Sequence, residues 1–225
     1  MMNSLDMEQC CPNSSGVSLS RDKIESPIER VSQALRALAP LPLRELHYLE
    51  TRLRLLELGR GEALTRAGEI ADCFGFVVSG LIRKRFVTPA GRAVVRGFGA
   101  PGSWVGAYAS LLTGQASYLA VEAVLDSDLV VLDWSEMNTL YRRHAAWQEI
   151  GRKIAEALVL EREQRAHELL VLSARERYLR FCDSHRALLP HIKGYEIASY
   201  LGITPVSLSR LKARLARPRA AQKPR

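Results

Sequence analysis

Side chains suited to binding a polyanion are concentrated near the end of the sequence. Hydroxyl, small and basic side chains gather there without a carboxylate: Thr204, Pro205, Val206, Ser207, Ser209, Arg210, Lys212 and Arg214. Residues 205–225 hold seven basic residues and no acidic one. Hydroxyls and cations donate hydrogen bonds to phosphate oxygens, and an arginine such as Arg210 can bind guanine through two hydrogen bonds. The predicted chemistry is therefore recognition of double-stranded DNA rather than a reaction.

Apolar residues around this segment predict two short helices that would present it. The expected buried faces are Ile197, Ala198 and Leu201 on the first helix and Leu208, Leu211 and Leu215 on the second. Gly202 can adopt the left-handed conformation of a tight turn, which Ile203 would anchor in the core. Thr204 is a good N-cap and Pro205 suits the first helical position. This layout is typical of a helix-turn-helix whose second helix enters the major groove; a helical hairpin with a basic outer face is the alternative.

The net charge is unevenly distributed along the chain. The 225 residues carry a formal charge of +8. Residues 1–172 contain 20 Lys and Arg against 21 Asp and Glu, whereas residues 173–225 contain 12 against 3. An excess of positive charge confined to the last quarter indicates a polyanionic partner, with a solvated basic tail as the alternative.

A long helix is predicted just before this basic part. Residues 144–171 contain no proline and one glycine, and their apolar residues recur every three or four positions. The pattern predicts a helix of about 28 residues, roughly 42 Å long. Such a helix outruns the preceding β region, so we expect one face to pack against its own copy in a homodimer. Glu161 and Arg165 interrupt the apolar stripe, so it is no pure leucine zipper; packing wholly within one chain is the alternative.

The first half of the chain has different signals. Residues 1–26 are polar and predict a disordered lead, after which Pro27 opens a helical pattern and a short second helix runs through Leu49. Between Leu53 and Leu132, short apolar runs alternate with glycine and proline. The runs are 73–78, 81–87, 93–98, 118–125 and 129–132. Short strands at this spacing predict an antiparallel sandwich or barrel.

Several other chemistries lack the residues they need. The cysteines Cys10, Cys11, Cys73 and Cys182 show no zinc-site spacing, and the five histidines form no HxH or HxxxH pair. Haem ligation within the β region would depend on Cys73 alone, and a redox role for Cys10 and Cys11 stays open. No nucleophile lies in a strand–turn–helix context, so catalysis is not expected. The sequence therefore predicts neither an enzyme nor a metal or other cofactor.

Neither a membrane nor a secretory segment is predicted. No stretch approaches the ~18 uninterrupted apolar residues that a spanning helix needs. The start of the chain has neither a basic region nor an apolar core of a signal peptide. We therefore expect a cytoplasmic protein.

Five motifs in the β region and in the helix pair follow one another in a recognisable order. Residues 59–69 are similar to a turn-strand-turn "KGE-LFREGE", 76–83 to "Y-VLSG-VR", 91–92 to "DGRE", 101–106 to "PGD-VG", and 202–210 to "LGITPESLSR". With these motifs the chain resembles the CRP/FNR family of bacterial transcription regulators. The resemblance covers about residues 28–215. It implies an α+β fold: an N-terminal cyclic-nucleotide-binding-like jelly roll, a long dimerisation helix and a C-terminal winged helix-turn-helix. The implied parts are a sensor domain over 27–135, a dimerisation helix over 136–172 and a DNA-binding domain with a basic tail over 173–225, with RNA polymerase as a further partner.

Two departures from the family pattern concern what the protein would bind. Cyclic-AMP receptors of the family hold the ribose with a Glu after the phosphate-cassette Gly and the phosphate with an Arg-Ser pair. Here Gly106 is followed by Ala107, and the pair reads Ser117-Tyr118. The family register places Arg162 and Glu163 of the long helix at the positions that contact the adenine in family members. A degenerate effector pocket over these six residues predicts weak or no cyclic-AMP binding, because the phosphate loses its charge-assisted partner.

The second departure lies in the DNA-reading helix. Many family members place Arg-Glu at its first turn, where this chain has Pro205 and Val206. The predicted operator therefore differs from the family's best-known palindrome. Two functions remain open: a homodimeric DNA-binding transcription regulator, or a small-molecule-binding regulatory module whose basic C-terminus contacts a non-DNA acidic partner.

Overall fold

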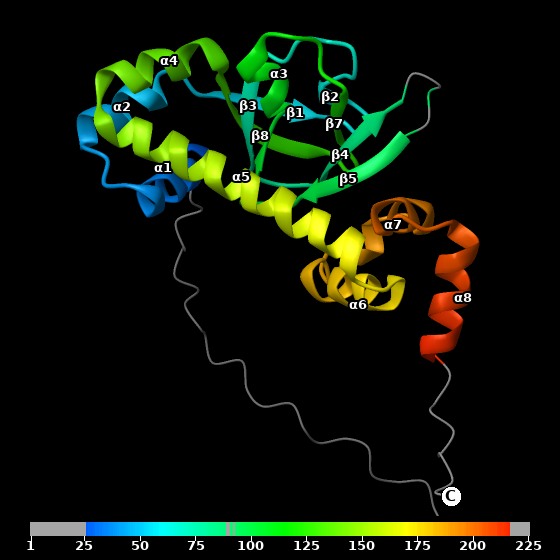
Figure 1. Ribbon diagram of the computed structural model, residues 1–225. Coiled ribbons are helices and arrows are strands. Elements are labelled where there is room, and N and C mark those ends of the chain that lie inside the picture. Colours follow the sequence, from blue (N-terminus) through cyan, green and yellow to red (C-terminus); the bar gives the residue numbers. More distant parts are fainter. Residues whose placement is uncertain (1–25, 89–90, 92, 217–225) are drawn as a thin grey trace, which may run out of the picture.

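The computed structural model describes residues 26–88, 91 and 93–216, and it contains a β roll of two four-stranded antiparallel sheets (Figure 1). One sheet has the strand order β1-β8-β3-β6 and the other β2-β7-β4-β5. The strands are β1 (Arg54–Leu58), β2 (Ala63–Thr65), β3 (Cys73–Val77), β4 (Ile82–Val87), β5 (Ala93–Gly99), β6 (Trp104–Val105), β7 (Leu119–Ala123) and β8 (Ser127–Asp133). Together with the helices described below, the two sheets confirm the predicted α+β fold with a jelly roll.

The core of the roll lies between the two sheets. Val77 on β3 and Leu129 on β8 come from one sheet and Val121 on β7 from the other, and all three are fully buried. Every residue of β3 and of β7 is buried, so neither strand shows the alternation of buried and exposed residues that is typical of a half-exposed strand. Both strands are internal in their sheets.

Most predicted elements agree with the observed ones, and the exceptions are three strands and two helices. The five predicted strands correspond to β3, β4, β5, β7 and β8. Four elements were not predicted: β1, β2, β6 and the six-residue helix α3 (Tyr108–Thr113). The range 136–172, predicted as one helix, contains most of a separate helix, α4 (Trp134–Arg143), before the long helix begins at Ala145. With three residues in β2 and two in β6, neither strand is long enough to show a period-two pattern.

Three helices cover one side of the roll (Figure 1). They are α1 (Pro27–Leu38), α2 (Leu43–Glu50) and α4 (Trp134–Arg143). The predicted helix start at Pro27 is confirmed: Ser26 and Glu29 form a capping box, with the Glu29 amide donating to Ser26 Oγ over 3.1 Å. Apart from Ser26, the predicted disordered lead over 1–26, with Cys10 and Cys11, lies outside the described residues.

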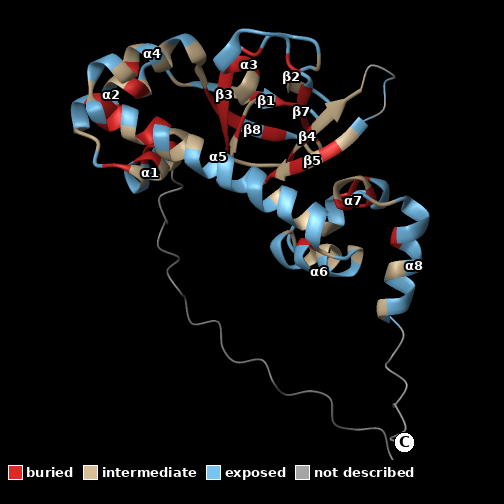
Figure 2. Cartoon of the chain, viewed as in Figure 1, coloured by how far each residue is buried: buried red, intermediate tan, exposed pale blue. Residues whose placement is uncertain are grey.

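The predicted long helix is α5 (Ala145–Val171), with 27 residues. His144 separates it from α4 and caps it, because its Nδ1 accepts from the Ala146 amide over 3.1 Å. The buried residues of α5 are confined to its first two turns, and Figure 2 shows its second half largely exposed. Over the stretches that the structure describes, no helix combines the length and apolar character needed to cross a membrane.

A buried carboxylate holds the start of α5 against α2. Glu45 is 3% exposed and accepts hydrogen bonds from the indole of Trp147 over 3.1 Å and from Arg143 Nε over 3.2 Å. Burial raises the pKa of Glu45, but these hydrogen bonds and the Arg143 charge outweigh it and lower the pKa overall. Glu45 therefore stays ionised and links three helices.

Replacing Glu45 with Ala is expected to lower the free energy of unfolding by about 3 kcal/mol, because it leaves the Trp147 indole and the Arg143 guanidinium without their acceptor. Urea unfolding followed by tryptophan fluorescence measures the change. Glu50→Ala on the same helix is the matched control and should shift stability by no more than about 0.5 kcal/mol. Equal effects of the two substitutions would contradict the role given to Glu45.

Candidate nucleic-acid interface and ligand cavity

Two short helices near the C-terminus form the predicted helix-turn-helix. They are α7 (Gly194–Leu201) and α8 (Pro205–Ala216), and α6 (Ala174–Ser184) and a short 3-10 helix (Leu189–His191) precede them. Ile197, Ala198 and Leu201 are buried as predicted. Gly202 has a φ of +68°, the left-handed conformation that the turn requires. The Ile203 amide donates to the Ala198 carbonyl over 3.0 Å, and the Ile203 side chain packs at the edge of the same apolar cluster.

Local hydrogen bonds fix the start of α8. The Ser207 amide donates to Thr204 Oγ1 over 3.1 Å, so Thr204 is the N-cap and Pro205 the first helical residue, as predicted. The hydroxyls of Thr204 and Ser207 also lie 2.9 Å apart. Leu208 is buried, whereas Leu211 and Leu215 are only half-buried against the rest of the domain.

The candidate DNA-contacting side chains lie together on the outer surface of α8. The exposed ones are Thr204, Pro205, Val206, Ser207, Ser209, Arg210, Lys212 and Arg214. Figure 1 places α8 on the side of this domain away from the β roll, and Figure 2 shows it mostly exposed. The basic tail over 217–225 lies outside the described residues, and a wing following α8 would lie there too.

A buried ion-pair cluster docks α7 on the β roll. Glu196, which is 2% exposed, pairs with Arg83 of β4, and Arg83 Nη2 also lies 2.8 Å from Glu122 of β7. Arg85 Nη2 contacts the same Glu122 carboxylate over 2.6 Å. Burial raises the pKa of Glu122, but hydrogen bonds from Arg85 and Arg83 outweigh it and lower the pKa overall. The stabilisation from these pairs is therefore present above the ordinary pKa of a glutamate and is lost as the pH falls through the lowered pKa.

The end of α5 holds α7 from its other side. The Arg165 guanidinium lies 3.9 Å from the centre of the Tyr200 ring and donates to the Tyr200 carbonyl. The Val95 amide of β5 donates to Ser199 Oγ over 3.0 Å. One short helix thus contacts both the roll and the long helix.

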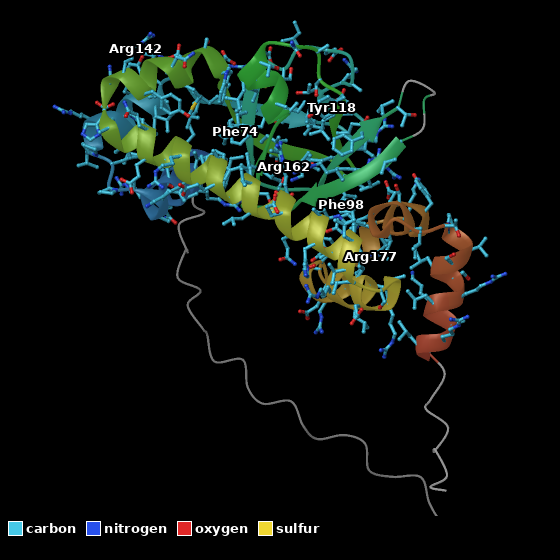
Figure 3. All side chains as sticks on the ribbon, in the orientation of Figure 1. Phe74, Phe98, Tyr118, Arg142, Arg162 and Arg177 are labelled. Atoms are coloured by element: carbon cyan, nitrogen blue, oxygen red, sulfur yellow. The ribbon has the colours of Figure 1, made fainter. Side chains whose placement is uncertain are left out.

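A cavity of about 570 Å³ lies between the β roll and α5. Of the predicted effector residues, Gly106, Ala107, Ser117, Tyr118 and Arg162 line it, whereas Glu163 does not. Figure 3 shows Tyr118 on the roll and Arg162 on α5. The cavity volume suits a small organic molecule. The structure thus brings together five of the six residues on which the prediction rested.

The cassette positions offer little to a cyclic nucleotide. Ala107 has no carboxylate for a ribose hydroxyl, and it is buried. Ser117 Oγ donates to the Leu119 carbonyl over 2.8 Å and accepts from the Leu119 amide over 3.0 Å, so its hydroxyl is already used. A Cβ on Gly106 would lie 2.6 Å from Phe74 Cδ2, which explains the glycine by close packing.

The structure shows two cavity-lining cations that the analysis of the sequence missed. Lys84 of β4 and Arg96 of β5 both line the cavity, where they share the Glu161 carboxylate of α5 at 3.4 Å and 3.6 Å. The cavity therefore holds these two cations in addition to the predicted Arg162, although the cassette arginine is absent. The alternation of Ile82, Lys84 and Phe86 could have placed Lys84 on the inner face.

Cys73 is the cysteine that lies in the β roll. Cys73 packs in the core of the roll, and burial raises the pKa of its thiol to about 12. It is therefore a core residue rather than a nucleophile or metal ligand. No group of three or more His, Cys, Asp or Glu side chains that could hold a metal ion occurs among the described residues.

Comparisons with known proteins agree with this architecture. Residues 55–144 match the family model of the cyclic nucleotide-binding domain. FixK2 from Bradyrhizobium japonicum is similar over 72% of this chain and 84% of its own, with a TM-score of 0.62 and 22% identity. The global regulator CLP from Xanthomonas campestris is similar over 77% and 91%, with a TM-score of 0.61 and 15% identity. A transcriptional regulator of the CRP/FNR family from Eubacterium rectale is similar over 80% and 87%, with a TM-score of 0.66 and 14% identity.

None of the curated proteins compared with the chain matches it. The matched region and the helices after it have the architecture of a cyclic-nucleotide-binding-like domain followed by a helix-turn-helix. The chain has the fold of the CRP/FNR family transcription regulators, as the sequence motifs predicted. At identities of 14% to 22%, the similarity shows the fold alone and does not assign functional residues to this chain.

Replacing Glu196 with Gln is expected to loosen α7 from the roll, because Arg83 loses one of its two carboxylate partners. The amide of Val95, which donates to Ser199 of α7, should then exchange its hydrogen about tenfold faster. Hydrogen exchange followed by mass spectrometry measures this. Glu163→Gln, at an exposed position of α5, is the control, and identical exchange in both variants would contradict docking through Glu196.

Proposed function

We propose that this protein is a homodimeric DNA-binding transcription regulator with a ligand cavity in its β roll. The observation that carries the proposal is the exposed, basic outer surface of α8, which is the second helix of a helix-turn-helix. Arg210 at its middle is exposed and, among the described residues, forms no ion pair. In this geometry Arg210 reads a base edge, while Thr204 and Lys212 contact phosphates.

The second half of α5 supports the homodimer. Val159, Leu160 and Leu170 are 55%, 69% and 85% exposed, which is unusual for apolar residues along one helix. A second copy packed against residues 144–171 would cover them. A two-fold axis along α5 would present two copies of α8 to successive major grooves. RNA polymerase is the further partner that a regulator of this architecture implies.

The cavity would act as the sensor, and its lining argues against cyclic AMP as the effector. Ala107 and the internally bonded Ser117 occupy the positions that would hold the ribose and the phosphate. The second candidate function is a ligand-binding module whose basic C-terminus contacts an acidic partner other than DNA. The charge of residues 173–225 favours it as much as it favours DNA, so the two are separated by measuring sequence preference.

Full-length protein should bind DNA selected from a random pool with a steep dependence on salt, because phosphate contacts release counterions. Arg210→Ala is expected to cost about 1–3 kcal/mol, with the loss concentrated at one base position of each half-site. Fluorescence anisotropy on duplexes substituted at each position measures the loss.

Arg142→Ala is the matched control, because Arg142 lies on α4 and not on the helix-turn-helix. This variant should bind every duplex with the affinity of the unchanged protein. A uniform loss over all duplexes would make Arg210 a phosphate contact only. Equal affinity for all DNA sequences and for heparin would favour the second candidate function.

Calorimetric titration with cyclic AMP and with cyclic GMP should show no binding in the micromolar range, because Ala107 offers no carboxylate to the ribose hydroxyl and the Ser117 hydroxyl is already bonded to Leu119. Circular dichroism of the same sample confirms that the protein is folded. A micromolar dissociation constant for either nucleotide would contradict this assignment of the cavity.

A further inference from the structure

Two buried cations in the cavity share a single carboxylate. Lys84 is 6% exposed, and the side chain of Arg96 is 14% exposed. Both point to the same oxygen of Glu161, whose side chain is 46% exposed. Two positive charges thus face one negative charge that water also reaches. Burial of unpaired charge is costly, so this end of the cavity favours a further anion.

The electrostatics of the two cations agree with this charge deficit. Burial lowers the pKa of Lys84, and the Glu161 charge only partly opposes it. The pKa of Arg96 is lowered for the same reason. Arg162 of α5 adds to the effect on both, lines the same cavity, and makes no ion pair or hydrogen bond with any other described residue. One carboxylate therefore does not balance the cations gathered here.

The backbone of β5 is shaped to bring Arg96 to this point. Opposite β4, Lys84 pairs with Gly97 and Arg85 pairs with Val95, so Arg96 is the extra residue of a β-bulge. A bulge changes the direction of the side chain it carries, and bulges are common beside binding sites. The position of Arg96 in the cavity is thus a property of the strand pairing.

Aromatic and apolar side chains form the rest of the wall. Phe86 and Tyr118 lie with ring centres 5.7 Å apart, and Phe74 stacks on Trp104 at 5.8 Å. All four line the cavity. Rings of this kind suit the flat or apolar body of a small molecule.

We propose that the cavity binds an organic anion other than a cyclic nucleotide: a carboxylate or phosphate with an apolar or aromatic body and no ribose, because the Ala107 side chain offers a ribose hydroxyl no acceptor. Its acidic group takes the place of the Glu161 carboxylate against Lys84 and Arg96, and its body lies against the rings of Phe86 and Tyr118. The inference deepens the proposed sensor role of this cavity. Displacing Glu161 would break both ion pairs that join α5 to β4 and β5, so binding would alter the contact between the roll and the proposed dimer helix.

The test uses a pair of fluorescent probes that share an aromatic skeleton and differ in charge. Anilinonaphthalene sulfonate carries one negative charge, and phenylnaphthylamine carries none. Full-length protein should bind both probes. Lys84→Met should weaken the anionic probe about tenfold and leave the neutral probe unchanged, because it removes one charge-assisted contact while keeping the volume of the side chain. Glu161→Gln should tighten the anionic probe several-fold, because it removes the competing carboxylate.

Opposite effects of two substitutions on one probe cannot come from a general loss of folding. Arg142→Met, an exposed cation outside the cavity, is the control for net charge and should change neither affinity. The proposal is overturned if the anionic probe does not bind the unchanged protein. It is also overturned if, in both cavity variants, the ratio of the two probe affinities stays within twofold of the ratio measured for the unchanged protein. Competition by benzoate and by phenyl phosphate then separates a carboxylate from a phosphate ligand. No DNA is present, so failure here leaves the DNA-binding proposal to its own test.

Discussion

The uninterrupted backbone of α5 is the constraint on which the rest of the molecule depends. Its first turns are fixed by Trp147 and Ile150 in the apolar core and by the Glu45 cluster, while its last turns hold α7 through Arg165. Between these ends, Glu161 and Arg162 reach the cavity. A helix is a rigid element that can carry a displacement along its axis. The proposed ligand binding at the cavity and the proposed DNA binding at the helix-turn-helix would therefore act on the same 27-residue helix. The same helix leaves apolar side chains exposed, and we propose that a second copy packs against them.

The helix pair near the C-terminus was predictable because local rules determine it. Gly202 at the turn, Thr204 as the cap and Pro205 at the first helical position each act on their own backbone, so their types indicate the structure directly. The long helix followed from the absence of proline and the apolar spacing in the same way. The very short strands and α3 were not predictable, because their conformation is set by neighbours distant in the sequence.

The cavity shows a limit of comparison by motif. The motif positions Ala107 and Ser117 predicted an altered cassette, and the family register added Arg162 as the single cation of the pocket. Lys84 and Arg96 come from strands outside the cassette, and Arg96 enters through a bulge that needs the pairing of β4 with β5 to exist. A period-two reading of β4 could place Lys84 on the inner face, whereas nothing in the sequence alone places Arg96 there.

We propose that a two-fold pair of these chains presents two copies of α8 to DNA. This arrangement can be tested by hydroxyl-radical footprinting of a DNA site selected by the full-length protein. We expect two protected segments of equal strength, with centres about one helical turn or roughly 10 base pairs apart. A single protected segment, or protection spread evenly along the DNA, would contradict it.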